Sequence, residues 1–573
     1  MKNLKSLYSY LIVVVGFIFI SYAYNPQLLK GKIVNQSDIS SWEGMAHEIV
    51  EHNKANPDDK TLWTNSMFGG MPATSISAEH PGDFTEPLYN LLLIGERPAS
   101  YLFISLLGGF LLFLAFGANV WLSAIGAIAI TFCSYNMQII QVGHNSKMLA
   151  IAYMPWVLAA LVYAYRKKPL LGSIFFAFAL SFQIKANHPQ ITYYLAFIVL
   201  GYAIAQMCSA IKNKTFPSFF RTSLMVLVAG LLGIATNTTK LLPTYEYAKY
   251  TMRGGSELTK DSQVQTEDGL DIDYATAWSY GITETPNLLI PNFNGGSSSG
   301  RLTKDSETYK VLRSNYQGAN QLINQMPLYW GPQPFTAGPM YLGAFSLFLF
   351  VLGLCIIRGK YKWWIVGVSL LGLFLGWGSH FMWFSELFFK YVPLYNKFRT
   401  VSMALVVLQI TVPVLGILAV KQLLESGDDK ETKERNKRGV MIALGATAGV
   451  SMIFAIFPSL AGNFISSADS SLPGDIAAAL VEDRKALLRG DAFRSIIFIL
   501  LGATALWCGY IKKIKLPLCY ALIGVVMLVD LWSVDKRYLN DSHYIRRQEY
   551  KNLFAKRPVD EIILQDKDPN YRV

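Results

Sequence analysis

About thirteen apolar segments, each near the thickness of a bilayer, constrain the fold of this 573-residue chain more than any other feature. A helix needs about 20 mostly apolar residues to cross the hydrocarbon core. Charged residues make up 16% of the chain, well below the roughly 25% of soluble domains. The sequence therefore predicts an all-α polytopic integral membrane protein with about 13 transmembrane helices. The segments lie at 8–24, 98–116, 119–135, 148–165, 169–184, 190–211, 221–243, 337–357, 361–378, 400–423, 439–460, 493–511 and 515–531.

Lysine and arginine gather in the loops between alternate segments, and this pattern predicts the orientation. By the positive-inside rule these loops face the cytoplasm, so the N-terminus is predicted to be cytoplasmic and the segment 8–24 to be an uncleaved anchor. The net charge of +12 therefore comes from the clusters that set the topology rather than from a binding face, and no nucleic-acid partner is predicted. The cluster at 428–438 is expected to be a solvated inner loop. The basic groups are Lys2 with Lys5, 166–168, 212–221, 358–362, 430–438 and 512–515.

The opposite, extracytoplasmic side is predicted to hold the long loops and all seven histidines. This placement suggests that the chemistry is extracytoplasmic. The predicted division is a first transmembrane helix, a first loop, a group of helices, a second loop, a further group of helices and a tail. These parts span 1–24, 25–97, 98–243, 244–336, 337–531 and 532–573.

The first loop contains a long polar segment, 35–72, with one carboxylate close to the bilayer boundary. Ser40 followed by Glu43 fits a capping box and predicts a surface-lying helix that starts there, because apolar residues then recur at helical spacing. Asp38 comes just before it. There a carboxylate can meet both a lipid-linked substrate and water, although a turn or capping residue would look the same.

Several cationic or donor side chains are expected at the same membrane surface. The segment QVGHNSKM carries His144 and Lys147 one helical turn apart, and QIKANHPQ carries Lys185 and His188. Arg399 stands at the start of a predicted span. These groups can bind a phosphate. They can equally anchor helix ends at the interface.

The second long loop closes with PLYWGPQPFTAGPMY, which contains Tyr329, Trp330 and Phe335. Aromatic residues near a span can stack on sugars. They can also form the aromatic belt of a membrane protein, and we favour the belt.

The acidic residues of the first loop could bind a divalent metal ion, because carboxylates are the ligands of hard cations. The residues concerned are Glu43, Asp58, Asp59, Glu79 and Asp83. No cofactor is predicted.

Seven short motifs, in order along the chain, resemble the YfhO family of bacterial membrane proteins, in the superfamily of glycosyltransferases with the GT-C fold, and particularly its Bacteroidetes members. The motifs are SDISSWEGM (37–45), LWTNSMFGGMP (62–72), VGHNSKMLAIAYMP (142–155), ANHPQITYY (186–194), YEYAKYTMRGGSELT (245–259), YWGPQPFTAGPMYLGA (329–344) and PLYNKFRTVSM (393–403).

The resemblance implies a GT-C-like enzyme of the bacterial inner (cytoplasmic) membrane. It would transfer a sugar from a polyprenyl-phosphate-linked donor, among membrane lipids, to a cell-envelope glycan or protein acceptor. The position that matches the acidic catalytic residue is Asp38, as general base, with Glu43 as a weaker candidate. The donor phosphate would then be bound by some of the cationic residues already named: His144, Lys147, Lys185, His188 and Arg399. Family members are longer, so the tail is expected to be the start of a truncated soluble region.

Two other functions compete with this hypothesis. A transporter or flippase of a lipid-linked glycan would use the same cations, but it should carry ionisable residues inside its spans and internal symmetry. The predicted spans are nearly free of charge and show no repeat. A non-catalytic scaffold for envelope assembly would tolerate substitution of Asp38.

Overall fold

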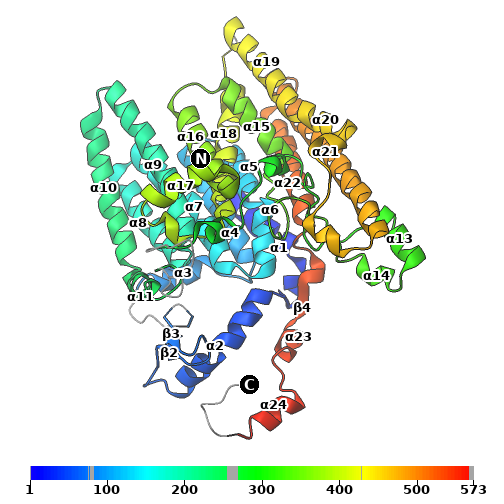
Figure 1. Cartoon of the computed structure of the whole chain (residues 1–573). Helices are drawn as coiled ribbons and strands as arrows, with labels where there is room; N and C mark the ends of the chain where they lie inside the picture. Colours follow the sequence, from blue (N-terminus) through cyan, green and yellow to red (C-terminus); the bar gives the residue numbers. More distant parts are fainter. Residues whose placement is uncertain (1, 75, 78–82, 255–268, 428, 567–573) are drawn as a thin grey trace.

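The chain is a bundle of long helices with short helices and loops gathered at one end (Figure 1). The computed structural model describes residues 2–74, 76–77, 83–254, 269–427 and 429–566. Within these ranges nine helices are long and apolar enough to cross a membrane, or ten if the bent pair α5–α6 is one span, and three apolar helices are shorter. The protein is therefore an all-α polytopic membrane protein, as predicted.

Every predicted span coincides with a helix or a broken helix. The bundle helices are α1 (Lys2–Tyr24), α4 (Ala99–Ala115), α5 (Val120–Thr131), α6 (Ser134–Val142), α7 (Asn145–Arg166), α8 (Pro169–Lys185), α9 (Pro189–Lys212), α10 (Phe216–Ala235), α15 (Ala344–Ile356), α16 (Lys360–Trp377), α18 (Val406–Leu424), α19 (Lys430–Leu444), α20 (Val450–Ile456), α21 (Gly474–Tyr510) and α22 (Leu516–Asp535).

Helices α7 and α18 lie in the centre of the bundle and are almost entirely buried. Small residues allow close contact around α7, which is how helices associate where no water drives them together. A Cβ at Gly172 of α8 would come within 2.4 Å of the Ala164 backbone, and one at Gly108 of α4 within 3.2 Å of the Ala152 carbonyl. This packing holds α7 closely against α4 and α8.

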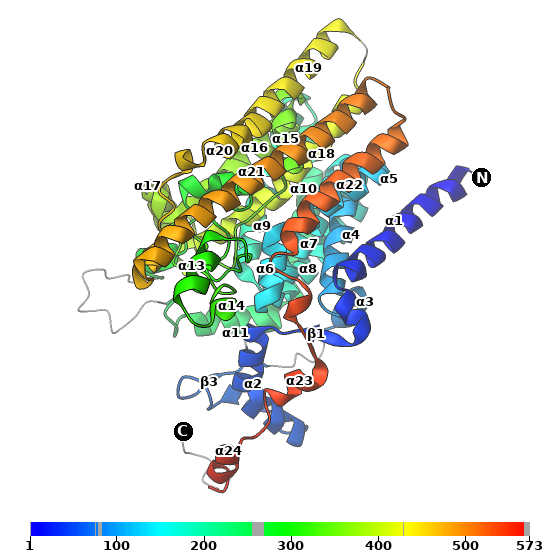
Figure 2. The same ribbon diagram turned by 90° about the vertical axis from the view of Figure 1, so that its right-hand side faces the viewer.

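The two ends of the bundle differ in composition. At one end, called here the basic end, lie the N-terminus and the start of α19, as Figure 2 shows. There Lys421 donates to the Gly117 carbonyl at 2.6 Å. The other end, called the loop end, carries α2 and the C-terminal helices (Figure 2). The positive-inside rule predicts that the loop end is extracytoplasmic.

The loop end is built from short elements. They are β1 (Lys32–Val34), α2 (Ser37–Ala55), β2 (Trp63–Thr64), β3 (Met71–Pro72), α3 (Glu86–Leu92), α11 (Thr238–Ala248), α12 (Ile272–Thr276), α13 (Glu307–Asn315), α14 (Ala319–Leu322), α17 (Met382–Tyr391), β4 (Tyr544–Arg546), α23 (Arg547–Asn552) and α24 (Pro558–Ile563). Strand β2 pairs antiparallel with β3.

The C-terminal tail fastens the base of the first loop. Strand β4 pairs antiparallel with β1, with Tyr544 opposite Val34. The Tyr544 hydroxyl donates to Asn25 at 2.5 Å, and the Lys536 ammonium donates to the Tyr24 carbonyl at 2.7 Å. The extended and short helical pieces expected in the tail are present, and they fix the point from which α2 starts.

Helix α2 begins earlier than predicted. Gln36 precedes its first residue in an extended conformation, because β1 delivers the chain almost to that point. The predicted capping box is therefore wrong, and the Ser40 hydroxyl instead donates to the Ser37 carbonyl at 3.0 Å. Asp38 lies in the first helical turn rather than before the helix, where the helix dipole favours a carboxylate.

Two other boundaries differ from the prediction. The described part of the charged segment 428–438 is not a loop. Helix α19 starts at Lys430 and is capped by Asp429, whose carboxylate accepts from the Thr432 N–H at 2.8 Å. The predicted span 221–243 is two helices, because the Asn237 side chain donates to the Ser181 carbonyl at 3.1 Å and ends α10 near that point. A hydropathy pattern does not contain these polar contacts.

A fully buried arginine joins α21 to the loops around it. Arg484 is 0% exposed and donates twice to the Asp469 carboxylate, at 2.6 and 2.8 Å. It also donates to the carbonyls of Phe464 at 2.7 Å and Leu328 at 3.1 Å. One side chain thus sets the positions of two separate loop segments.

We expect Arg484→Leu to destabilise the protein by about 3–5 kcal/mol, because it leaves the buried Asp469 carboxylate without its partner. Thermal unfolding in lipid nanodiscs measures the effect. The neighbouring Lys485→Met is the control, because it breaks a surface pair with Glu482 of 2.7 Å, worth about 0–1 kcal/mol. Equal melting temperatures for the two variants would contradict this role of Arg484.

Candidate active site

The N-terminal end of α2 rests on the junction between α6 and α7. Gln36 and Asn145 exchange side-chain hydrogen bonds of 3.0 and 3.1 Å, and Gln36 also donates to the Ile140 carbonyl at 2.5 Å. Gly143 ends α6 with a positive φ of 105°, and a Cβ there would lie 3.2 Å from the Asp38 side chain. Only a glycine leaves room for Asp38 to come this close to α7.

Asp38, His144 and Lys147 form a row of three side chains joined by two polar contacts. The Oδ2 atom of Asp38 lies 2.8 Å from Nε2 of His144, and the two side chains are 51% and 42% exposed. At the other edge of the His144 ring, Nδ1 lies 3.2 Å from the Lys147 ammonium. The first turn of α2 and the start of α7 thus bring together a carboxylate and an imidazole that are open to solvent and an ammonium group that is half-buried.

The contacts define the state of His144. An ammonium group can only donate, so Nδ1 accepts from Lys147 and Nε2 carries the proton that is donated to Asp38. Burial lowers the pKa of His144, the Lys147 charge lowers it further, and Asp38 opposes both. The imidazole is therefore neutral at pH 7, and it orients the Asp38 carboxylate without neutralising it.

Further basic side chains surround Asp38, His144 and Lys147. Burial lowers the pKa of His188, and the charges of the nearby Lys147 and Arg253 lower it further. Burial likewise lowers the pKa of Arg253, and the charge of Arg399 adds to this. We call the five basic residues His144, Lys147, His188, Arg253 and Arg399 the basic cluster. They come from the start of α7, the residue before α9, the segment after α11 and the segment before α18.

Arg399 is held from two sides and its guanidinium is exposed. The guanidinium lies 5.7 Å from the centre of the Tyr274 ring and donates to the Tyr274 hydroxyl. Its carbonyl accepts from Gln190 at 2.7 Å. Arg253 is fixed by Lys397, with each side chain donating to the carbonyl of the other. Both guanidinium groups are thus positioned before any ligand arrives.

The structure does not bring Lys185 into the basic cluster. Its ammonium lies 2.5 Å from the Asp83 carboxylate and 3.8 Å from Glu86, and it sits over the Tyr89 ring at 5.3 Å. Burial raises the pKa of Asp83, but its bonds to Lys185 and Thr85 outweigh this and lower it. Lys185 is engaged in a buried ion pair that anchors the end of the first loop.

Glu43 lies away from Asp38 on α2. Five residues turn a helix by about 140° beyond one full turn, so the two carboxylates face different directions. Burial raises the pKa of Tyr550 to about 12, and the nearby Glu43 carboxylate adds to the rise. Glu43 therefore lies towards α23 of the tail.

The acidic residues of the first loop that the sequence offers as metal ligands do not lie together in the structure. Glu79 lies outside the described residues. Glu43 lies near Tyr550, and Asp83 binds Lys185. Within the described ranges, no group of three or more His, Cys, Asp or Glu side chains is arranged to hold a metal ion.

Sequence reasoning missed Arg253 as a site residue. It was visible as a basic residue in YEYAKYTMRGG, at the start of the second loop. Its approach to Arg399 depends on contacts with Lys397, which a sequence pattern does not reveal.

We expect the half-buried His188 to make the protein sensitive to acid. Burial, with Lys147, lowers its pKa from 6.5 to about 3, so between these values the unfolded chain binds a proton that the folded chain does not. Stability is then lost as the pH falls from 6.5 towards 3, by about 1.4 kcal/mol per pH unit. Melting temperatures in nanodiscs from pH 7 to 4 measure this. His188→Gln should flatten the curve, whereas the exposed His47→Gln should follow wild type; parallel curves for all three proteins would contradict the assignment.

No known family model and no curated protein matches the sequence. Two solved structures resemble the fold at a distance. The arabinofuranosyltransferase AftD from Mycobacteria matches with a TM-score of 0.37 and 12% identity, over 76% of this chain and 27% of that one. ArnT from Cupriavidus metallidurans, bound to undecaprenyl phosphate, matches with a TM-score of 0.38 and 12% identity, over 93% of this chain and 77% of that one. The chain thus spans about a quarter of the length of AftD, and neither likeness is close enough to assign an activity.

Proposed function

We propose that the protein is a membrane glycosyltransferase of the GT-C type. It transfers a sugar from a polyprenyl-phosphate-linked donor to a cell-envelope acceptor on the extracytoplasmic side of the inner membrane. The observation that carries the proposal is the contact of the Asp38 carboxylate with His144 of the basic cluster. The order of the motifs that resemble the YfhO family supports it.

The reaction needs a base at the acceptor. The acceptor hydroxyl attacks the anomeric carbon, the bond from that carbon to the phosphate oxygen breaks, and Asp38 takes the hydroxyl proton. General-base assistance of this kind contributes roughly 10²–10⁴-fold. The second oxygen of Asp38 is available for this role, since His144 contacts Oδ2.

The reaction also needs positive charge at the leaving group. The departing polyprenyl phosphate gains negative charge as the bond breaks, and fixed cations stabilise that change more than they stabilise the bound donor. Lys147, Arg253 and Arg399 provide three cations against the single carboxylate of Asp38. This surplus suits a phosphate group, and Arg399 can bind two of its oxygens.

One observation favours the alternative, a transporter of a lipid-linked glycan. The spans are less free of charge than their hydropathy predicts, because Arg494 of α21 forms an ion pair of 2.9 Å with the fully buried Asp530 of α22. Buried ionisable residues are a feature of transport pathways. However, Asp530 also accepts from the Tyr341 hydroxyl at 2.6 Å and the Phe345 N–H at 3.3 Å. These bonds anchor the start of α15, which accounts for the pair without transport.

The test is incorporation of radiolabelled sugar from synthetic polyprenyl-phosphate donors into envelope material by membranes that contain the protein. We expect label to be transferred, and membranes without the protein to transfer none. Label that moves between leaflets on its lipid, with no transfer from any donor, would overturn the proposal in favour of transport.

A further inference from the structure

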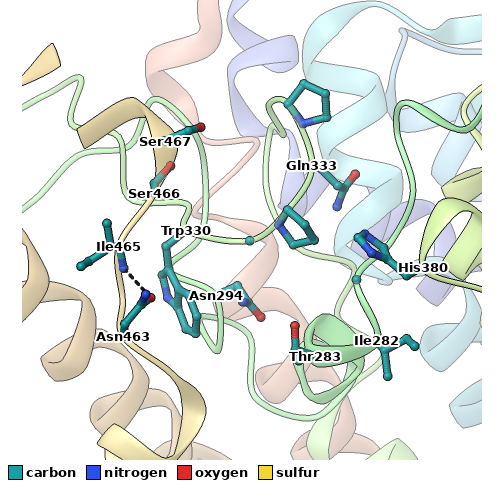
Figure 3. Close-up of a pocket in the computed structure, with 14 residues that line it drawn as sticks. Ile282, Thr283, Asn294, Trp330, Gln333, His380, Asn463, Ile465, Ser466 and Ser467 are labelled. Carbon is teal, nitrogen blue, oxygen red and sulfur yellow. Dashed lines mark hydrogen bonds between the residues drawn. The ribbon is translucent and has the colours of Figure 1, made fainter. Parts of the chain in front are cut away.

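A groove of about 730 Å³ opens at the loop end, away from Asp38. Figure 3 shows its walls, which come from segments far apart in the sequence. They are 281–283 after α12, Asn294, 330–334 before α15, His380 after α16, and Asn463 with 465–467 after α20.

The first wall is held in place by one buried carboxylate. Glu284 is 1% exposed and accepts from the Gly281 N–H at 2.7 Å, the Tyr329 hydroxyl at 2.7 Å and the Gln333 amide at 3.2 Å. Burial raises the pKa of Glu284, and these hydrogen bonds oppose the rise. The network fixes the segments at 281–283 and 330–334 relative to each other.

The second wall is held by Arg484, which binds the carbonyls of Leu328 and Phe464. The Trp330 and Phe464 rings then pack at 4.8 Å. Gly462 is required beside them, since a Cβ at its φ of 149° would lie 3.1 Å from the indole. The groove is therefore built before a ligand arrives, as binding sites usually are.

Two hydrogen-bond donors in the groove have no acceptor. The indole N–H of Trp330 and the side-chain N–H₂ of Asn294 are buried, and neither finds a partner among the described residues. Asn294 is 1% exposed, and its side-chain oxygen already accepts from Asn287 at 3.1 Å. Because burying a donor without an acceptor is unfavourable, such a pair at a groove wall points to a ligand that supplies oxygen atoms.

The groove also carries no formal charge at neutral pH. Among the described residues that line it there is no Lys, Arg, Asp or Glu, whereas hydroxyl and amide groups alternate with an indole and prolines. A phosphate or a phospholipid headgroup would need cations, which the basic cluster provides elsewhere. Hydroxyl-rich uncharged ligands with apolar ring faces, which are sugars, match this lining.

We propose that this groove binds an uncharged stretch of carbohydrate and is the subsite for the acceptor glycan. The role as acceptor subsite rests on the proposed function, whereas the binding of carbohydrate does not. Trp330 thus belongs to a sugar site rather than to an aromatic belt. Tyr329 instead supports the wall through Glu284.

Trp278 links a segment next to the groove to the segment that carries Arg399. The Trp278 indole donates to the Phe335 carbonyl at 3.2 Å, next to the groove segment 330–334. The Trp278 carbonyl accepts from the Ser402 N–H at 3.2 Å, in the segment that carries Arg399. The segments next to the groove and next to Arg399 are thus held together through Trp278.

The binding test uses an array of neutral and acidic oligosaccharides and the full-length protein in lipid nanodiscs, because sugar-headed detergents would compete for the groove. We expect wild type to retain at least one neutral oligosaccharide. Trp330→Phe keeps a ring against Phe464 but removes the indole N–H, so retention should fall about 10-fold or more. The control Trp383→Phe changes an indole on α17 that is 68% exposed and outside the groove, and should retain like wild type.

Retention of no neutral oligosaccharide, or equal retention by the Trp330 and Trp383 variants, would overturn the groove assignment. A separate measurement concerns its role in transfer. In the transfer assay Trp330→Phe should raise the acceptor KM about 10-fold with little change in kcat. If wild type binds neutral glycan but transfers no sugar, the proposed function fails while the binding site stands; if it transfers sugar but binds no neutral glycan, the reverse holds.

Discussion

Asp38→Asn is expected to lower kcat for sugar transfer by about 10²–10⁴-fold, with little change in the donor KM. The amide keeps the size of the carboxylate and can accept from His144 at the same position, so α2 stays in place. It cannot take the proton of the acceptor hydroxyl. Transfer of radiolabelled sugar at saturating donor measures the effect.

Asp58→Asn is the matched control, because Asp58 is an exposed carboxylate in the same loop. It should transfer sugar at the wild-type rate. Transfer by correctly inserted Asp38→Asn at the wild-type rate would show that Asp38 is not the base. The scaffold hypothesis predicts that outcome.

The second large effect is expected for Arg399→Gln. Loss of one cation that faces developing charge costs about 10²–10³-fold in rate, and Arg399 is an exposed member of the basic cluster. Both kcat and donor affinity should therefore fall, the affinity less than kcat. The rate of polyprenyl phosphate release at several donor concentrations separates the two.

Lys390→Gln removes an exposed cation from the neighbouring α17 and is the matched control. Its kinetics should equal those of wild type. If the two variants lose activity equally, the cations act only through the general charge of the surface, and Arg399 has no particular role at the phosphate.

The sequence predicts the bundle well because each span needs only a long apolar run, which is a local property. It predicts the neighbourhood of Asp38 less well. His144 is about a hundred positions away from Asp38, and their contact depends on a strand pair with the tail and on the space left by Gly143. The motif that contains His144 indicated a phosphate site, but not its carboxylate partner.

The placements that the sequence did not predict have the same origin. Lys185 is a cation near the predicted membrane surface, as a phosphate ligand would be. The fold of the first loop, however, places the Asp83 carboxylate 2.5 Å from its ammonium group. Glu43 is separated from Asp38 by the helical turn, once the helix starts at Ser37 rather than at Ser40. The groove around Trp330 could be suspected from its aromatic motif, but Asn294 joins it only through a loop held by Asn287.

The most direct test of the central claim is the fate of a doubly labelled donor in proteoliposomes that contain purified protein and an acceptor glycan. We predict that sugar leaves the lipid and appears on the acceptor, that one polyprenyl phosphate forms for each sugar transferred, and that Asp38→Asn stops both. Donor that crosses the bilayer intact, with no polyprenyl phosphate formed, would contradict the assignment as a glycosyltransferase.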